Sequence, residues 1–290
     1  MGMVFLVILA GGVVRMTQSG MGCPDWPKCF GMWIPPTDAS QLPADFEKYL
    51  SKQDIDHSFN VYHTWIEYIN RLLGALLGVF ILGYLVWSIR KFWTTNKKIV
   101  GVAFLLLIAV GIQGYLGKVV VDENLAVVKI TIHMIGALVI AALPLININI
   151  LSSERIKVNQ LIKHGTTAVI LLLLVQIILG TQVREEIDLI SKALNYEQRD
   201  LWIERLGIIF LVHRSFSWVI LISCLGLYYV GRNFASYTGH IKLILSVLGA
   251  IILLGIIMAY LDMPAIAQPL HLLLASALLM QLFYSRIKME

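Results

Sequence analysis

Residues 72–89 read LLGALLGVFILGYLVWSI, eighteen consecutive positions without a charged side chain. A helix rises 1.5 Å per residue, so about 20 apolar residues cross the ~30 Å hydrocarbon core of a bilayer. The stretch therefore predicts a membrane-spanning helix, which we extend to about 63–89.

The composition of the whole chain agrees with a membrane protein. Apolar residues make up 58% of the 290 residues and charged residues only 14%, and the mean hydropathy is +0.78. A soluble domain carries roughly a quarter charged residues, so this chain has too few to cover a water-facing surface. Eight spans are expected, over about 1–16, 63–89, 99–120, 125–150, 164–184, 204–230, 241–260 and 266–286. The first lacks the basic start and small-residue cleavage site of a signal peptide, so we expect a true span.

Basic residues gather in the segments that follow each even-numbered span. They are Arg90, Lys91, Lys97, Lys98, Arg155, Lys157, Lys163, Arg232, Lys242, Arg286 and Lys288. The same segments hold only two acids, Glu154 and Glu290. The positive-inside rule therefore places these segments and both termini in the cytoplasm or the matrix, and in a bacterium the membrane would be the inner one. The net charge of +5 needs no nucleic acid to explain it.

Two of the three cysteines lie close together in the first outer loop, in the stretch Cys23-Pro-Asp-Trp-Pro-Lys-Cys29. A pair six residues apart on the oxidising face favours a disulfide across a turn that contains proline. Unpaired thiols are the main alternative, since a metal site would need further ligands nearby. Cys224 stands alone inside the sixth span, where we expect it to pack.

The chain repeats itself weakly, through landmarks in the same order. Gly11-Gly-Val-Val-Arg15 ends the first span and Gly180-Thr-Gln-Val-Arg184 the fifth. The second span carries Glu67-Tyr-Ile-Asn70-Arg71, the sixth carries Phe210-Leu-Val-His213-Arg214, and the fourth and eighth carry His133 and His271. Halves separated by four spans share one orientation, so we expect an all-α protein of two pseudo-symmetric four-helix bundles, over 1–150 and 151–290.

The loops on the predicted outer side are the long ones. Residues 17–62 contain both loop cysteines, and residues 185–203 are acidic and are expected to form a short amphipathic helix. Loops of this length could cover the outer mouths of the bundles. The functional face is therefore expected to be the outer one.

Three histidines lie inside predicted spans, about 8–15 Å from the outer end. Ionisable residues at such depth are costly and usually functional. His213 and His271 could face each other across one bundle and hold a planar macrocycle through two neutral imidazoles. The alternative for any one of them, including His133, is a hydrogen bond to a neighbouring helix. Small residues that would let a flat ring or a helix approach are Gly74, Gly78, Gly111, Gly114 and Gly117.

Charged residues accompany these positions. Arg71 and Arg214 directly follow the repeat positions, where a guanidinium suits the carboxylates of such a macrocycle; the alternative is snorkelling to headgroups. Glu67 lies four residues after His63 and four before Arg71, so the three share one helix face. Glu67 is either a proton acceptor or cation stabiliser beside a substrate, or a buried partner for Arg71.

Taken together, these stretches resemble the haem A synthase family over nearly the whole chain. The resemblance rests on residues 11–29, Glu67-Tyr-Ile-Asn-Arg71, Gln113-Gly-Tyr-Leu-Gly117, His133, His213-Arg214 and His271. It implies oxidation of a methyl group of haem O to the formyl group of haem A, for cytochrome oxidase biogenesis. It also implies a haem b between His213 and His271, and a substrate haem in the N-terminal bundle. The family carries similarly placed loop cysteines.

One position departs from the family pattern, because Asn70 stands where Glu-x-x-His-Arg is usual. Either His63, about 10.5 Å nearer the outer side on the same face, replaces the missing ligand, or the haem is five-coordinate through His133 with Asn70 as a hydrogen-bonding neighbour. We favour His63, because packing alone explains His-x-x-x-Glu at a bundle mouth poorly.

The resulting hypothesis is that haem O enters the N-terminal bundle from the lipid and Glu67 assists oxidation of its methyl group. Haem b would relay electrons from an unidentified donor, and haem O synthase and the cytochrome oxidase assembly machinery would be partners. Two other functions stay open, a dihaem b-type cytochrome that exchanges electrons with quinol and a non-catalytic haem carrier or assembly factor. Parallel repeats without a broken helix fit a transporter least.

Overall fold

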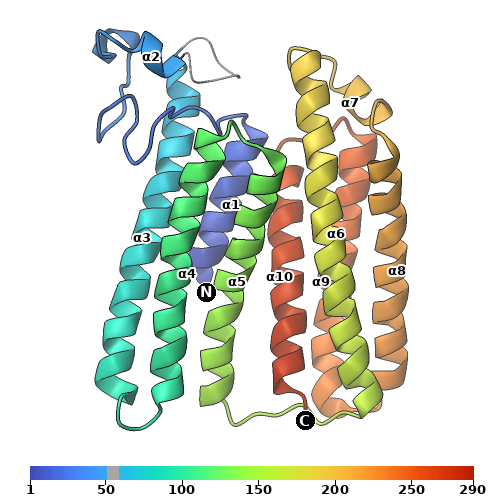
Figure 1. The fold of residues 1–290 in the computed structure, drawn as a ribbon. Coiled ribbons are helices and arrows are strands. Elements are labelled where there is room, and N and C mark those ends of the chain that lie inside the picture. Colours follow the sequence, from blue (N-terminus) through green and yellow to red (C-terminus); the bar gives the residue numbers. More distant parts are fainter. Residues whose placement is uncertain (51–58) are drawn as a thin grey trace. The chain divides into compact units, whose positions relative to one another are not determined.

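The computed structural model describes residues 1–50 and 59–290, so part of the predicted outer loop 17–62 lies outside the described residues. The described residues form helices and no named strand (Figure 1). The helices are α1 (Gly2–Met16), α2 (Glu47–Leu50), α3 (Val61–Phe92), α4 (Lys97–Asp122), α5 (Val127–Leu151), α6 (Gln160–Ala193), α7 (Asp200–Glu204), α8 (Ile208–Gly231), α9 (Ala235–Tyr260) and α10 (Ala267–Lys288), with a short 3-10 turn η1 (Ala39–Gln41).

The predicted all-α membrane class is confirmed. Within the described ranges, seven helices are long and apolar enough to cross a membrane, namely α3, α4, α5, α6, α8, α9 and α10. The predicted span over 1–16 corresponds to α1, which is apolar but has only 15 residues. The chain is therefore a multi-pass membrane protein.

Asparagine side chains begin three of the long helices. Asn60 accepts hydrogen bonds from the backbone N–H groups of Tyr62 and His63 at the start of α3. Asn96 and Asn159 cap α4 and α6 in the same way. Each cap satisfies N–H groups that have no partner inside the helix, which explains why the helices start at these residues.

One predicted element differs from the structure. No separate amphipathic helix covers 185–203; instead α6 continues to Ala193, and only the short α7 follows. The continuation is stabilised because Val183 and Ile187 keep helical spacing and pack with buried Trp202. A helix with one apolar stripe buried in this way persists beyond the membrane-spanning part.

The chain divides into two compact units, Met1–Pro144 and Leu145–Glu290. In the first unit α3 packs against both α1 and α4. In the second unit α6 and α9 each pack against both α8 and α10, which closes a ring of four helices. α8 and α10 are therefore opposite members of this ring.

Polar contacts close one end of the second unit. The buried ammonium of Lys288 lies 2.8 Å from a carboxylate oxygen of Glu154, and Ile156 pairs with Met289 through backbone hydrogen bonds of 3.0–3.1 Å involving their neighbours. The nearby ammonium holds the pKa of Glu154 below its usual range. The segment before α6 is thereby tied to the end of α10.

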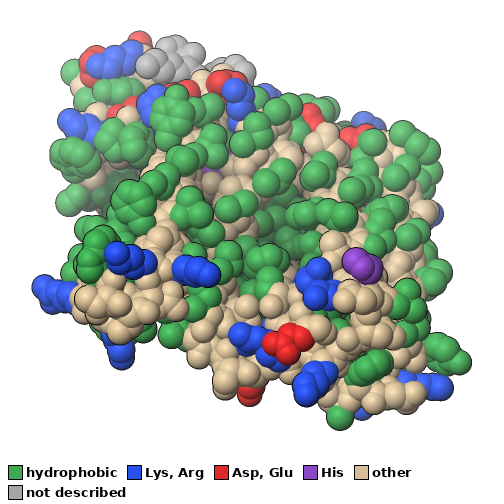
Figure 2. All heavy atoms as spheres, turned by 60° about the horizontal axis from the view of Figure 1, so that its bottom comes forward, with side chains coloured by type: hydrophobic (Ala, Val, Ile, Leu, Met, Phe, Trp, Pro, Cys, Tyr) green, Lys and Arg blue, Asp and Glu red, His purple; other side chains and the backbone are tan. Residues whose placement is uncertain are grey.

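The surface of the helices carries both exposed apolar side chains and basic residues. Large apolar side chains of α3, among them Leu72, Leu76, Val79 and Phe80, are exposed along its length, as expected for a face that meets lipid. Figure 2 shows Lys and Arg side chains gathered at the end of the molecule that it brings forward. The end of α3 and the start of α4 carry four of the basic residues used above for orientation.

Candidate functional site

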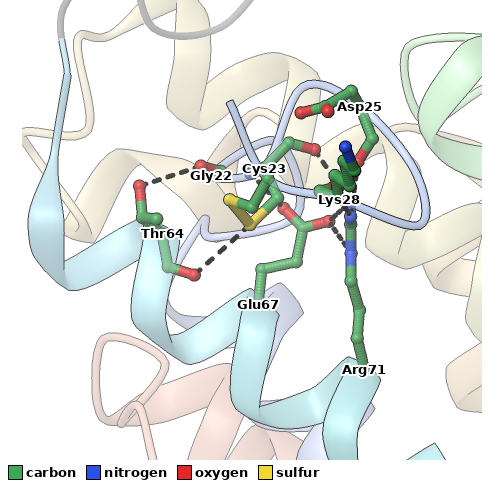
Figure 3. A network of polar contacts seen from close by, with 8 residues as sticks. Gly22, Cys23, Asp25, Lys28, Thr64, Glu67 and Arg71 are labelled. Carbon is green, nitrogen blue, oxygen red and sulfur yellow. Dashed lines mark hydrogen bonds and ion pairs between the residues drawn. A yellow bond between two sulfur atoms is a disulfide. The ribbon is translucent and has the colours of Figure 1, made fainter. Parts of the chain in front are cut away.

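A loop closed by a disulfide sits on the N-terminal end of α3. Cys23 is bonded to Cys29, and both are fully buried. The hydroxyl of Thr64 on α3 donates to the carbonyl of Gly22 at 2.8 Å (Figure 3). A Cβ at Gly22 would come within 2.3 Å of the carbonyl oxygen of His63. Only glycine therefore lets the loop approach α3 this closely.

Glu67 lies beneath this loop and is 4% exposed. One of its carboxylate oxygens accepts a hydrogen bond from the backbone N–H of Cys23 at 2.8 Å. The other accepts from the Nε–H of Arg71 at 3.0 Å. A buried carboxylate is costly unless it is paired and hydrogen-bonded, and here both conditions hold.

Arg71 completes the network by binding loop carbonyls. Its guanidinium donates to the backbone oxygens of Cys23 at 2.8 Å, Asp25 at 2.5 Å and Lys28 at 3.1 Å (Figure 3). It also pairs with Glu67, which is the second of the two interpretations of that acid. The guanidinium is thus occupied by protein groups, and a role for Arg71 in binding a macrocycle stays a prediction. What the arrangement does is fix the position of the Glu67 carboxylate.

Each interior histidine lies against a glycine of a neighbouring helix. A Cβ added to Gly180 on α6 would lie 3.2 Å from Cε1 of His213 on α8. The corresponding distances are 3.4 Å between Gly117 and His133, and 3.7 Å between Gly255 and His271. The rings therefore fill space that a larger side chain would take. This is the close approach predicted for Gly117; Gly78 meets only Val110, and Gly74, Gly111 and Gly114 meet nothing within 4 Å.

Two glutamines hold the backbone of these histidines. The side-chain amide of Gln113 donates to the carbonyl of His133 at 2.7 Å, and that of Gln176 donates to the carbonyl of His213 at 3.0 Å. Each glutamine lies one turn before the glycine behind the same ring. Sequence reasoning assigned no role to Gln176 or Gly180, although the shared spacing Gln-x-x-x-Gly at 113–117 and 176–180 was a usable signal.

The ring nitrogens indicate what the histidines can bind. The Nδ1 atoms of His133, His213 and His271 are buried and have no hydrogen-bond partner among the described residues. His213 lies on α8 and His271 on α10, which are opposite members of the ring of four helices. Two such imidazoles on opposite helices of a bundle could provide the axial ligands of a haem iron.

The remaining predicted residues lie on α3 and α8. His63 lies in the first turn of α3, where its backbone N–H donates to the side-chain oxygen of Asn60 at 3.2 Å. Asn70 lies deeper in α3, and its buried Oδ1 has no hydrogen-bond partner within the described ranges. Arg214 is exposed, and its guanidinium lies 5.6 Å from the ring centre of Phe210.

Relatives of known name share part of this chain. A protein of Shewanella oneidensis named heme A synthase is 30% identical over 141 residues, which cover 49% of this chain and 40% of that protein. A heme A synthase of Bartonella tribocorum is 28% identical over 196 residues, with 61% and 53% covered. Yeast heme A synthase COX15 is 31% identical over 134 residues, with 43% and 26% covered. The matches thus span about half, or less, of each relative. No solved structure matches the chain.

A family-wide comparison covers far more of the chain than any one of these relatives. The model of the family described as cytochrome oxidase assembly protein, COX15-CtaA, matches residues 1–283. The match includes the disulfide loop, Glu67 and all three interior histidines. The chain therefore belongs to the COX15-CtaA family of cytochrome oxidase assembly proteins.

Proposed function

We propose that this protein is a haem A synthase, an oxidoreductase that converts a methyl group of haem O into the formyl group of haem A. The observation that carries the proposal is the difference between repeat positions of α3 and α8. The first unit has an acid and an amide, Glu67 and Asn70, where the second has Phe210 and His213. The family and the names of the relatives support the same reaction.

The second unit has the residues to hold a haem b. His213 and His271 lie on opposite helices of the ring, carry unpartnered buried Nδ1 atoms and are backed by glycines. Imidazole nitrogens are common axial ligands of haem iron, so the residues fit the group. Bound there, haem b would supply one-electron transfer. Gln176 would orient His213 by fixing its carbonyl at 3.0 Å.

The first unit has the residues for chemistry on the substrate. His133 would hold the haem O iron, with Gln113 fixing the carbonyl of that histidine at 2.7 Å. Glu67 would accept a proton, or stabilise positive charge, at the methyl carbon that is oxidised. In low-dielectric surroundings its charge acts strongly over a short range. Because Cys23 and Arg71 hold both carboxylate oxygens, the acid is positioned before substrate arrives.

The setting of the reaction is part of the proposal. Positive charge on the turns and C-terminal segment supports a bacterial inner-membrane protein with both termini in the cytoplasm. Haem O would enter the first unit laterally from lipid. Haem O synthase would supply it, and the cytochrome oxidase assembly machinery would take haem A. The oxidant, the oxygen atom of the formyl group and the electron donor would come from outside this chain.

Expression with a haem O synthase, in a host that makes no haem A, tests the proposed reaction. Chromatography of the extracted haems should show haem A together with haem b. Haem b alone would support a dihaem cytochrome instead, and bound haem O without conversion would support a carrier. Gly249→Ala, at a glycine where an added Cβ would meet nothing within 4 Å, serves as a control for expression and insertion.

A further inference from the structure

Four residues occupy the repeat positions that face the bundle interiors, and they do not fill the space beside the neighbouring helix to the same extent. Three of them are histidines that lie 3.2–3.7 Å from the Cβ position of a neighbouring glycine. The fourth is Asn70, and the repeat pairs it with Gly11, since Gly11-Gly-Val-Val-Arg15 corresponds to Gly180-Thr-Gln-Val-Arg184. A Cβ at Gly11 would meet nothing within 4 Å. The space that His213 fills behind Gly180 is therefore open behind Gly11.

Asn70 has unused hydrogen-bonding capacity at this place. Its Oδ1 is buried and has no partner among the residues that the structure describes. A buried polar atom without a partner is unfavourable, so a ligand that pairs with the amide would be favoured there. An amide side chain offers both a donor and an acceptor. It is not among the usual axial ligands of haem iron, which are His, Cys, Met and Tyr.

We propose that Asn70 and Gly11 line an open axial position, so that a haem held by His133 binds a small exogenous ligand there, hydrogen-bonded to the Asn70 amide. The inference rests on the proposed function, because it requires haem O in the first unit. It adds the class of second ligand, a diatomic or similarly small molecule. Glu67 lies three residues before Asn70, on the same side of α3, so this ligand would bind within one helical turn of the acid.

The rival candidate for the open position is His63, and its backbone is part of the contact between α3 and the disulfide loop. His63 lies in the first turn of α3, about 10.5 Å along the axis from Asn70. Its backbone N–H donates to the side chain of Asn60. Its backbone carbonyl packs on Gly22, where an added Cβ would come within 2.3 Å of the carbonyl oxygen. The next residue, Thr64, and Glu67 one turn further in are bound to the same loop. This end of α3 is therefore fixed to the disulfide loop, and His63 stays the rival prediction that the experiment below must separate from an open position.

Carbon monoxide tests the inference on the full-length protein, loaded with haem O and reduced without air. We expect a high-spin signal from the substrate haem and one carbon monoxide bound per substrate haem. The haem b of the second unit should stay low-spin and unreactive. Asn70→His should convert the substrate haem to low-spin and abolish carbon monoxide binding. Gly11→Val should also abolish that binding by filling the open space, while the haem stays attached through His133.

The outcomes separate this inference from the proposed reaction. A low-spin substrate haem that ignores carbon monoxide in the unaltered protein overturns the inference, even where haem A is formed normally. If His63→Ala then made that haem high-spin, His63 would be the ligand. Carbon monoxide binding without haem A formation would support the open position and contradict the proposed reaction. Failure of haem O to bind the first unit would overturn both.

Discussion

Two arginines at equivalent repeat positions occupy opposite surroundings. Arg71 is half-buried, pairs with Glu67 and donates to three loop carbonyls. Arg214 is exposed and lies over the ring of Phe210. In both cases the partner stands four residues earlier, so helical spacing is the same and only the partner's chemistry differs. The repeat therefore provides the position, and the neighbouring residue decides what the arginine does.

The same contrast extends to the metal-binding positions. The second unit keeps a histidine pair on opposite helices, each ring backed by a glycine. The first unit keeps one such histidine, His133, and replaces its counterpart with Asn70 beside a buried acid. The proposed function follows this difference, with electron transfer assigned to one half and oxidation to the other.

Removing the charge of Glu67 should have the largest effect. Glu67→Gln keeps an oxygen that accepts from the N–H of Cys23 but loses the charge, so haem A formation should fall about 10²–10⁴-fold. The haem content should stay unchanged. The measurement is haem A formed per extracted haem b after expression with haem O synthase.

A matched variant in the other unit shows whether the effect belongs to the acid. Phe210→Leu alters the equivalent position of α8 and should leave haem A formation near its normal rate. Normal haem A formation by Glu67→Gln would remove the catalytic role. A protein that loses haem and unfolds at lower temperature would instead assign Glu67 to pairing with Arg71.

The next largest effect should come from the histidines, and it should differ between units. His213→Ala should remove haem b, because one axial ligand and its contact with Gly180 are lost together. His133→Ala should remove haem O while haem b stays. Extracted-haem chromatography and reduced-minus-oxidised spectra measure both. Retention of an unaltered low-spin spectrum by His213→Ala would exclude it as a ligand.

The spans were predictable from sequence, whereas the partners of the site residues were not. An apolar run long enough to cross a bilayer is a local property, and residues 72–89 show it without any knowledge of their neighbours. The repeat was predictable as well, because the glycine, arginine and histidine landmarks come in the same order along both halves of the sequence. The carbonyls that bind Arg71 belong to residues 23–28, more than forty positions away, and a backbone carbonyl carries no mark in the sequence.

Tertiary packing explains two further differences. The continuation of α6 to Ala193 depends on contacts of Ile187 with Trp202, which only the folded chain brings together. The glutamine contacts to His133 and His213 use side-chain amides against main-chain oxygens of another helix. Spacing alone places a glutamine on a helix face but does not say which carbonyl it meets.

A smaller effect is expected from crowding one histidine of the second unit. Gly180→Ala places a methyl group 3.2 Å from Cε1 of His213, so the ring must move by a few tenths of an ångström. Overpacking of this kind costs about 1–3 kcal/mol. We expect a shifted haem b spectrum and potential with the haem retained. Gly249→Ala in the same unit meets nothing within 4 Å and should change neither; equal spectra for both variants would show that the glycine contact does not position the ring.

The smallest effect should come from the glutamines, and it separates the two units most finely. Gln176→Leu removes one hydrogen bond to the His213 carbonyl, a net loss of about 1 kcal/mol, and should shift only the haem b potential. Gln113→Leu removes the bond to the His133 carbonyl and should weaken only haem O binding, seen as a raised substrate requirement with an unchanged maximal rate. If Gln176→Leu altered haem O binding, or Gln113→Leu the haem b potential, then the histidines of the two units would be coupled and the separation of electron transfer from oxidation would be wrong.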